Sequence, residues 1–268
     1  MIKIKRISTR EQVMELIAEQ QEYRTELDRY RSMYVYRGEP NAAFTLSTTL
    51  KRNCKEHQNE LEPIILKNFT KYAAFENEAL ENSIWRQMIL GQHHGLPTRL
   101  LDWSHSPLVA LHFAVTETHM DKMEKHDCTV WRTDMDELHA LLPEKYRKEL
   151  KDEKTSIFSV DIMNRVAKSL QEYDADMQNK SLVMIEPPSI DPRIISQYSF
   201  FSVIPGGMDS IEEFLDKYTE NTVKYIIDKE IKWYIRDMLD QLNISERTIY
   251  PGLDGLSKWL ARHYYVKD

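Results

Sequence analysis

The chain has 268 residues, of which 41% are hydrophobic and 29% charged, so it can bury a substantial core and extensive disorder is not expected. Its net charge of −7 does not favour wholesale binding of nucleic acid or of an acidic membrane, although it leaves room for a local basic groove. The seven glycines form neither a G-x-G-x-x-G nor a G-x-x-x-x-G-K-[ST] sequence, which argues against dinucleotide binding on a Rossmann sheet and against a P-loop.

Cysteine content and the N-terminal residues predict a soluble protein of a reducing compartment. Cys54 and Cys128 have no metal-type spacing and fit isolated thiols in a core. Residues 1–7 alternate apolar and basic side chains and lack the apolar stretch of a signal peptide, and no apolar run reaches membrane length. We therefore expect a cytoplasmic protein with no membrane partner, whose oligomeric state the sequence does not indicate.

The first hundred residues predict two short strands and three amphipathic helices. Alternation predicts an edge strand over residues 2–7, and aromatic and β-branched residues predict a strand over 33–36. A capping box at Ser8 and Glu11 opens a helix whose apolar spacing continues to Tyr30. The other two helices are expected at residues 61–72 and from about 77 to 90.

Residues 92–114 combine polar side chains with signals for a strand, a turn and a helix. Gly95 and Pro97 interrupt the backbone before a short buried strand that begins at Leu100. A serine cap and Pro107 then begin a helix. A strand that turns into a capped helix presents polar groups beside unpaired N–H groups, and this arrangement suits an anionic or sugar-bearing ligand.

The second half of the chain mixes strands and helices without regular βα alternation, which favours the α+β class. Residues 134–180 are expected to be helical and charge-rich, and we interpret them as an insertion or lid within a single domain over residues 1–268. The remaining strands are predicted at 128–131, 182–185, 194–195, 200–203 and 222–227, and helices at 210–218 and 231–242, with a last helix that carries Trp259.

Tyr36-Arg37-Gly38 ends a predicted strand with an arginine and a glycine. The guanidinium of Arg37 can hold a phosphate through two hydrogen bonds, and Gly38 allows another backbone to approach closely. The alternative is that Arg37 pairs with a carboxylate such as Asp102. The tripeptide alone leaves both interpretations open.

His93 and His94 are adjacent, and their spacing to Asp102 matches no standard zinc pattern, so we expect no metal site. Because histidine titrates near neutral pH, one of the pair can act as a general acid or base while the other is structural. Arg99 and Asp102 are three residues apart and most simply form an ion pair that shapes the loop. The alternative assigns Asp102 to acid–base chemistry.

Trp103 and Gln197 complete the set of candidates. Trp103 can stack on a base or a nicotinamide ring, or pack into the core beside two leucines. Gln197 is a polar side chain in an apolar setting and is expected to hydrogen-bond to a neighbour or to a ligand. The chain contains no G-x-S-x-G sequence, so acyl hydrolysis has no support.

Taken together, these motifs resemble the FRG domain family, which is named for a Phe-Arg-Gly tripeptide. The tripeptide stands here as Tyr36-Arg37-Gly38, with Tyr in place of Phe. The longest match runs from Gln92 to Ser104 and from Ser106 to Ala114, and weaker matches are residues 50–52, 193–197 and 250–255. The resemblance spans roughly residues 30–260, with the charged middle as its variable part, and implies little about activity.

A fainter resemblance links the chain to ADP-ribosyltransferases, whose core begins with a strand ending in Tyr-Arg-Gly. Their next elements are a strand ending in Ser-Thr-Ser and a helix reading Val-Ala-x-x-Phe; here the corresponding runs are Leu101-Asp102-Trp103-Ser104 and Val109-Ala110-Leu111-His112-Phe113. The resemblance implies a small mixed or antiparallel sheet surrounded by helices. Those enzymes carry a catalytic glutamate on a third element, where Gln197 stands nearest here, with Glu186 upstream. An amide would stabilise a cationic transition state less well than a carboxylate.

On this resemblance NAD is the expected substrate, and no metal is expected. Arg37 would hold the diphosphate, Trp103 and Ser104 would contact nicotinamide or ribose, and Asp102 or Gln197 would orient the reacting sugar. The implied catalytic residues are Arg37, His93, Asp102 and Gln197. The implied NAD-binding residues are Arg37, Gly38, Gln92, His94, Arg99, Trp103 and Ser104.

Three functions remain open from the sequence. The first is an NAD-using enzyme similar to ADP-ribosyltransferases, which modifies nucleic acid or protein or hydrolyses NAD, as a toxin or defence effector would. The second is a non-catalytic module that binds a nucleotide or a nucleic acid with the same cleft. The third is a metal-independent ribonuclease that uses His93 or His94 as acid or base.

Overall fold

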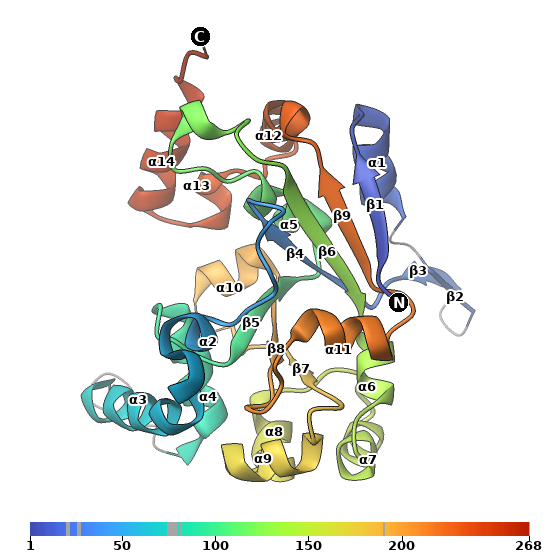
Figure 1. Ribbon diagram of the computed structural model, residues 1–268, viewed down its shortest axis with the longest axis vertical. Coiled ribbons are helices and arrows are strands. Elements are labelled where there is room, and N and C mark those ends of the chain that lie inside the picture. The colour runs from blue at the N-terminus through green and yellow to red at the C-terminus, as the bar shows by residue number, and fades with distance from the viewer. Residues whose placement is uncertain (20–21, 26–27, 74–79, 81, 190, 268) are drawn as a thin grey trace.

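A seven-stranded sheet runs through the computed structural model, which describes residues 1–19, 22–25, 28–73, 80, 82–189 and 191–267 (Figure 1). The strand order across the sheet is β1 (Lys3–Ile7), β9 (Val223–Ile227), β6 (Cys128–Asp134), β4 (Tyr34–Glu39), β5 (Leu100–Ser104), β8 (Ser199–Val203) and β7 (Val183–Ile185). The β1–β9 pair is parallel and the other neighbouring strands are antiparallel, so the sheet is mixed. The predicted α+β class, with helices around a mixed sheet, is confirmed.

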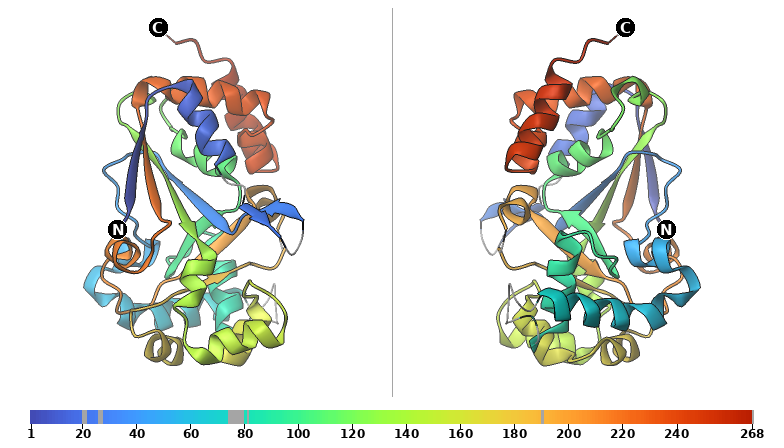
Figure 2. Two further views of the ribbon diagram at one scale, coloured as in Figure 1. Left: turned by 90° about the vertical axis from the view of Figure 1, so that its right-hand side faces the viewer. Right: turned by 90° about the vertical axis from the view of Figure 1, so that its left-hand side faces the viewer.

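Helices gather at the two ends of the sheet, as both Figure 1 and Figure 2 show. One group is α1 (Arg10–Ala18), α5 (Pro107–Ala114), α12 (Lys232–Gln241), α13 (Glu246–Ile249) and α14 (Leu253–His263). The other group is α2 (Thr49–Cys54), α3 (Gln58–Ala73), α4 (Ile84–His93), α6 (Met135–Ala140), α7 (Glu144–Asp152), α8 (Val160–Val166), α9 (Leu170–Met177) and α11 (Ile211–Tyr218). Between them lies α10 (Pro192–Gln197).

The core consists of three apolar clusters, which follow from the alternation of side chains along the strands. One cluster covers a single face of the sheet and contains Val35 of β4 together with Leu101 and Trp103 of β5. The opposite face carries two separate clusters. One contains Tyr36 of β4 and packs against α1, α5 and α12, and the other contains Leu100 of β5 and packs against α4 and α7 to α9. On that face, the boundary between the two clusters therefore lies between β4 and β5.

The sheet is nearly split at this boundary. β4 pairs with β6 along its whole length, and β5 does the same with β8. In contrast, β4 and β5 are paired only through Tyr36 and Ser104. The two strands diverge beyond that pair, so the edges of two half-sheets face each other across an opening.

Several predicted elements need correction. The first helix starts from the cap Thr9 and ends at Ala18 rather than continuing to Tyr30. Tyr23 and Tyr30 instead face each other in a hairpin of β2 (Glu22–Arg24) and β3 (Arg29–Arg31), where a cross-strand aromatic pair is favoured. The strand predicted at 194–195 is helix α10, because the pair Asp191-Pro192 is a cap followed by a helix-starting proline.

Two further predictions concern helical regions. The start expected near residue 77 lies outside the described residues, and the described helix there is α4. Residues 134–180 are helical as predicted, and α7 to α9 pack against β5, β7 and β8. Their interpretation as an insertion or lid stays a prediction. Within the described parts of the chain, we find no helix with the length and apolarity needed to cross a membrane.

Candidate ligand-binding cleft

A cleft of about 320 Å³ opens where β4 and β5 separate. Its polar lining comes from both half-sheets, from the end of α4 and from α10, and α5 adds an aromatic ring. The lining residues are Tyr36, Arg37, Gly38, Gln92, Asp102, Trp103, Ser104, Phe113, Arg193, Gln197 and Ser199. Seven of the residues predicted from the sequence are therefore brought together here.

Arg37 spans the opening between the two strands. Its Nε donates to Oε1 of Glu39 at 2.7 Å, and its Nη1 donates to the backbone oxygen of Asp102 at 2.8 Å. The Asp102 carboxylate lies further away, 3.7 Å from Nη1. The side chain therefore replaces the missing strand pairing, while Nη2 has no partner among the residues that the structure describes and remains available to an anion.

Gly38 lines the cleft, but its lack of a side chain serves the packing of α5. A Cβ atom at this position would lie 1.9 Å from the backbone oxygen of Ala110 and 2.5 Å from the backbone nitrogen of Ala114. The close approach expected from the sequence is thus made by a helix of this chain. It fixes α5, and with it Phe113, beside β4.

Asp102 presents a carboxylate at the centre of β5. The Thr98 hydroxyl donates to Oε1 of Gln92 at 2.6 Å, and Nε2 of Gln92 donates to Oδ2 of Asp102 at 2.8 Å. This chain of hydrogen bonds orients the carboxylate, whereas Oδ1 has no partner in the described part of the chain. Because the Asp102 side chain is 55% exposed, the free oxygen is accessible from the cleft.

Ser104 and Gln197 join β5 to α10. The Ser104 hydroxyl donates to the backbone oxygen of Gln197 at 2.6 Å and accepts from the backbone N–H of Ser106 at 3.0 Å. The side chain of Gln197 donates to the backbone oxygen of Ile249 at 3.3 Å. Gln197 therefore lies on a helix rather than on a strand, and its amide nitrogen is engaged with α13.

Arg99 lies away from the cleft. It does not pair with Asp102 as predicted: its guanidinium binds Glu62 with Nε at 2.9 Å from the carboxylate, and its Nη1 lies 2.6 Å from Asp174. These two carboxylates raise the pKa of Arg99 although burial opposes the rise. A buried guanidinium requires such partners, and the residue ties β5 to α3 and α9.

The two adjacent histidines also lie outside the cleft lining. Nε2 of His93 is 3.0 Å from Oδ2 of Asp191, the cap of α10, and His94 ends α4 on the exposed surface. Burial opposes a lower pKa for Asp191, but the backbone N–H of Arg193 and the His93 ring together lower it. His93 thus fastens the start of α10 to α4. Its assignment as a catalytic residue stays a prediction.

Trp103 occupies the core in agreement with the simpler of its two interpretations. Its side chain alternates with Asp102 and Ser104 along β5, so it points to the opposite face of the sheet. The indole N–H donates to the hydroxyl of Ser202 at 3.0 Å, and only 5% of the residue is exposed. The ring is therefore not accessible for stacking on a ligand.

Arg193 and Phe113 are cleft residues that the sequence did not single out. Arg193 is the second residue of α10, and its guanidinium carbon lies 5.1 Å from the centroid of the Tyr250 ring. Phe113 meets the same ring edge-on, with centroids 6.4 Å apart. The sequence signal that could have found Arg193 is the Asp-Pro helix start just before it, since it turns a predicted strand into a helix.

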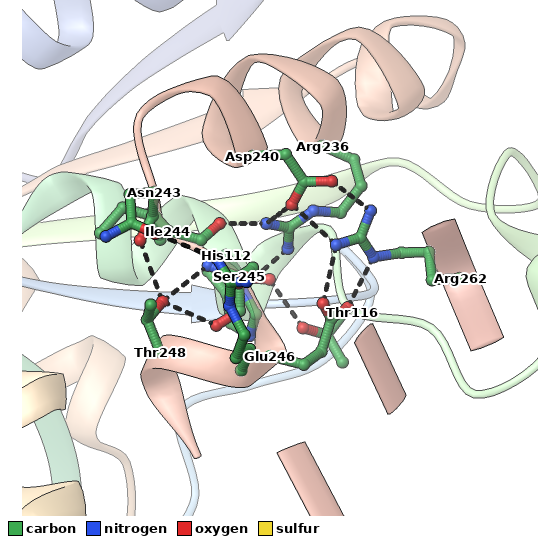
Figure 3. Close-up of polar contacts among 11 residues, drawn as sticks. His112, Thr116, Arg236, Asp240, Asn243, Ile244, Ser245, Glu246, Thr248 and Arg262 are labelled. Atoms are coloured by element: carbon green, nitrogen blue, oxygen red, sulfur yellow. Dashed lines mark hydrogen bonds and ion pairs between the residues drawn. The ribbon is translucent and has the colours of Figure 1, made fainter. Parts of the chain in front are cut away.

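A buried group of charged residues supports the wall that contains Tyr250. We call Arg236, Asp240, Glu246, Arg262 and His112 the C-terminal ionic cluster (Figure 3). Arg262 forms hydrogen bonds of 2.7 Å to both Asp240 and Glu246, and Nη1 of Arg236 lies 2.7 Å from Nδ1 of His112. The cluster thereby joins α5, α12, α13 and α14, and through Glu246 it fixes the start of α13, a short helix that ends at Ile249 just before Tyr250.

Among the described residues, no group of three or more His, Cys, Asp or Glu side chains has the arrangement of a metal site. The family model of the FRG domain matches residues 32–123. No curated protein and no solved structure gave a match. The chain therefore contains an FRG domain, and the matched residues include Arg37, Gln92, Asp102 and Phe113 of the cleft.

Proposed function

We propose that the cleft binds NAD and breaks the bond between its nicotinamide ring and the adjoining ribose, as ADP-ribosyltransferases do. The observation that carries the proposal is that two groups lie in the same cleft. Arg37 has a spare donor at the opening of the sheet, and Asp102 has a free and accessible carboxylate oxygen. A diphosphate needs the first group, and a sugar that becomes cationic needs the second.

The proposed step requires little from the protein beyond position and charge. The bond from C1′ of the ribose to the nicotinamide nitrogen breaks, and its electron pair leaves with nicotinamide. Oδ1 of Asp102 accepts a hydrogen bond from a ribose hydroxyl and stabilises the positive charge that develops on the sugar. A nucleophile, either water or a group on a nucleic acid or protein, then forms a bond to C1′ and loses a proton.

The order of the elements adds support. Tyr36-Arg37-Gly38 lies in β4, the Asp102 segment is β5, and the run from Val109 to Phe113 lies in α5. These are the three segments whose sequence resembles the start of the ADP-ribosyltransferase core, and all three line the cleft. Asp102 is a better candidate for the carboxylate than Gln197, because the Gln197 amide is bonded to α13.

Incubation of the purified chain with NAD, followed by mass spectrometry for nicotinamide and for ADP-ribose adducts, tests the proposal. We expect Arg37→Ala to raise KM for NAD, and Asp102→Asn to lower kcat about 100-fold with little change in KM. Arg165→Ala and Asp152→Asn are the matched controls, since both residues are exposed and far from the cleft lining. All four variants are first compared with the parent chain by thermal unfolding.

Nicotinamide release that is unchanged in both Arg37→Ala and Asp102→Asn would show that the cleft does not perform this reaction. If NAD raises the melting temperature without any release, the cleft binds the nucleotide and does not react with it. The third function, a ribonuclease, is not favoured by the geometry, because Nε2 of His93 is bound to Asp191 and neither His93 nor His94 lines the cleft.

A further inference from the structure

We propose that Arg193 is a second anion-binding residue of the cleft, which acts together with Arg37 and selects ligands that carry two linked phosphates. The proposal rests on the proposed function for the location of the ligand, but it does not depend on any reaction. It concerns a residue on α10, outside the part of the chain that the family model matches.

The charge of Arg193 is only partly balanced by the protein, because it helps to lower the pKa of the nearby Asp191 without forming an ion pair with it. Among the described residues, no carboxylate forms an ion pair with it, and its Nε is buried without a hydrogen-bond partner. Arg37 differs, because Glu39 lies 2.7 Å from its Nε. Because Nε is shielded from solvent, an anion in the cleft would bind the Nη groups of this half-buried side chain, which lines the cleft and whose Nη groups have no partner among the described residues.

Tyr250 holds the guanidinium of Arg193 in an orientation that suits an anion. A guanidinium over an aromatic ring is attracted by the face of the ring, while its N–H groups point outward in their own plane. The contact between Arg193 and Tyr250 therefore fixes the cation without using its donors. Phe113 contacts the Tyr250 ring edge-on and so helps to fix its position.

Helix α10 is anchored at both ends, so Arg193 is held in place before a ligand arrives. Its first end is fixed by the contact between Asp191 and His93, and its last residue, Gln197, is bonded to Ser104 and to Ile249. Such anchoring lowers the entropic cost of ordering the side chain on binding.

The two arginines approach the cleft from different elements, β4 and α10, and this favours a ligand with two anionic groups. Each guanidinium can bind one phosphate through paired hydrogen bonds. The Asp102 carboxylate lies beside Arg37, 3.7 Å from its Nη1, so the neutral or cationic part of the ligand is expected next to that carboxylate. A volume of about 320 Å³ fits a small molecule with this polarity, and a diphosphate nucleotide has it.

The test measures binding rather than turnover. Isothermal titration of the full chain with ADP, AMP and inorganic pyrophosphate is compared for the parent chain, Arg193→Gln, Arg193→Lys and Arg37→Gln. Arg165→Gln serves as the matched control, because this exposed arginine pairs with Glu149 and Glu153 far from the cleft lining. Melting temperatures verify that each variant is folded.

We expect the parent chain to bind ADP at least about tenfold more tightly than AMP. The second phosphate of ADP adds one charged hydrogen-bonding contact, with Arg193, and a contact of ordinary strength changes the affinity by about that factor. Arg193→Gln should weaken ADP and pyrophosphate binding about tenfold and AMP binding less than about threefold, so that the preference disappears. Arg37→Gln should weaken all three ligands. Arg193→Lys should restore part of the preference, because lysine keeps the charge but loses the planar fork.

The inference would be overturned if Arg193→Gln kept the preference for ADP over AMP, whether both affinities stay the same or both fall by the same factor. Arg193-dependent binding of a single-stranded oligonucleotide in preference to ADP would also overturn it. The failure of the proposed function is recognised separately. If ADP binds with the expected dependence on Arg193 while NAD releases no nicotinamide, the reaction is wrong and this inference stands.

Discussion

Two groups of arginines in this molecule have opposite environments. Arg37 and Arg193 line an open cleft with spare donors, whereas Arg236 and Arg262 lie in the C-terminal ionic cluster, where Arg262 is only 3% exposed and the unpartnered Nε of Arg236 is sealed inside the fold. Arg262 binds two carboxylates, and Arg193 binds none among the described residues. The comparison shows which guanidiniums hold the fold together and which remain able to bind something else.

The two groups are also physically connected. The cluster fixes α13, and the end of this helix reaches the cleft: its last residue, Ile249, accepts from Gln197, and the next residue, Tyr250, contacts Arg193. The paired arginines thus provide a rigid support for an unpaired one. The two roles can be tested separately, by the stability of variants in the cluster and by the ligand affinity of variants in the cleft.

Breaking the cluster should have the largest effect. Arg262→Met leaves the carboxylates of Asp240 and Glu246 in a mostly buried site without their main partner, and we expect a loss of about 3 to 5 kcal/mol in the free energy of unfolding. Urea denaturation measures it. The exposed Arg165→Met should cost no more than about 1 kcal/mol, because its ion pairs are on the surface. Equal losses in the two variants would contradict the structural role of the cluster.

Gly38→Ala tests whether the residue next to Arg37 serves packing. The added Cβ would overlap the backbone of α5, and we expect a loss of about 2 to 4 kcal/mol in the free energy of unfolding. Gly95→Ala is the control, since a Cβ there meets nothing within 4 Å and only its φ of +82° opposes the change, at about 1 kcal/mol. A Gly38→Ala variant as stable as the parent chain would show that α5 can move away.

Stability should fall as the pH decreases below 6.5. Burial and the neighbouring Arg236 lower the pKa of His112 to about 3, and burial lowers the pKa of His139 to about 4. Below pH 6.5 the unfolded chain binds protons that these folded side chains do not accept, so unfolding becomes more favourable. We expect a loss of about 3 kcal/mol between pH 6.5 and 5, about half from each histidine, measured by denaturation at several pH values.

Glu246 extends this pH dependence to lower values. Burial raises its pKa, but the hydrogen bonds from Arg262 outweigh it and bring the pKa to about 2. Its stabilising contribution is present above pH 4.5 and is lost as the pH falls towards 2.

The histidines can be tested separately from Glu246. His139→Gln should make the decrease in stability between pH 6.5 and 5 about half as steep, and an unchanged slope would exclude this histidine as a cause.

The smallest effect is expected from His93, on the side of the cleft. His93→Ala removes the contact with Asp191, which should cost about 1 kcal/mol or less in stability. Nucleotide affinity should fall about threefold, because α10 and therefore Arg193 become less well ordered. Titration of ADP measures this change. A loss of nicotinamide release of 100-fold at unchanged affinity would instead support the catalytic role predicted for His93.

The sequence predicted those parts of the cleft that are close together in the chain. The strand–helix segment from Leu100 to Ala114 and the Tyr36-Arg37-Gly38 tripeptide were found because their turn, cap and alternation signals are local. Partner choice is not local. Arg99 pairs with carboxylates 37 and 75 positions away, and spacing alone suggested Asp102 instead.

The same limit explains Arg193. Its contact with Tyr250 joins α10 to the end of α13, and no local pattern indicates it. The strand predicted at 194–195 came from two adjacent isoleucines, whereas the Asp191-Pro192 cap determines a helix. A helix places Arg193 and Gln197 four positions apart on one side, and both line the cleft as a result.

The family match covers one wall of the cleft and stops before the other. Arg37, Gln92, Asp102 and Phe113 lie within residues 32–123, while Arg193 and Gln197 come from chain that follows. A match to the family model therefore shows the first wall of the cleft and says nothing about the second. The anion contacts expected from Arg193 therefore have to be read from this part of each chain itself, because a match over residues 32–123 does not extend to it.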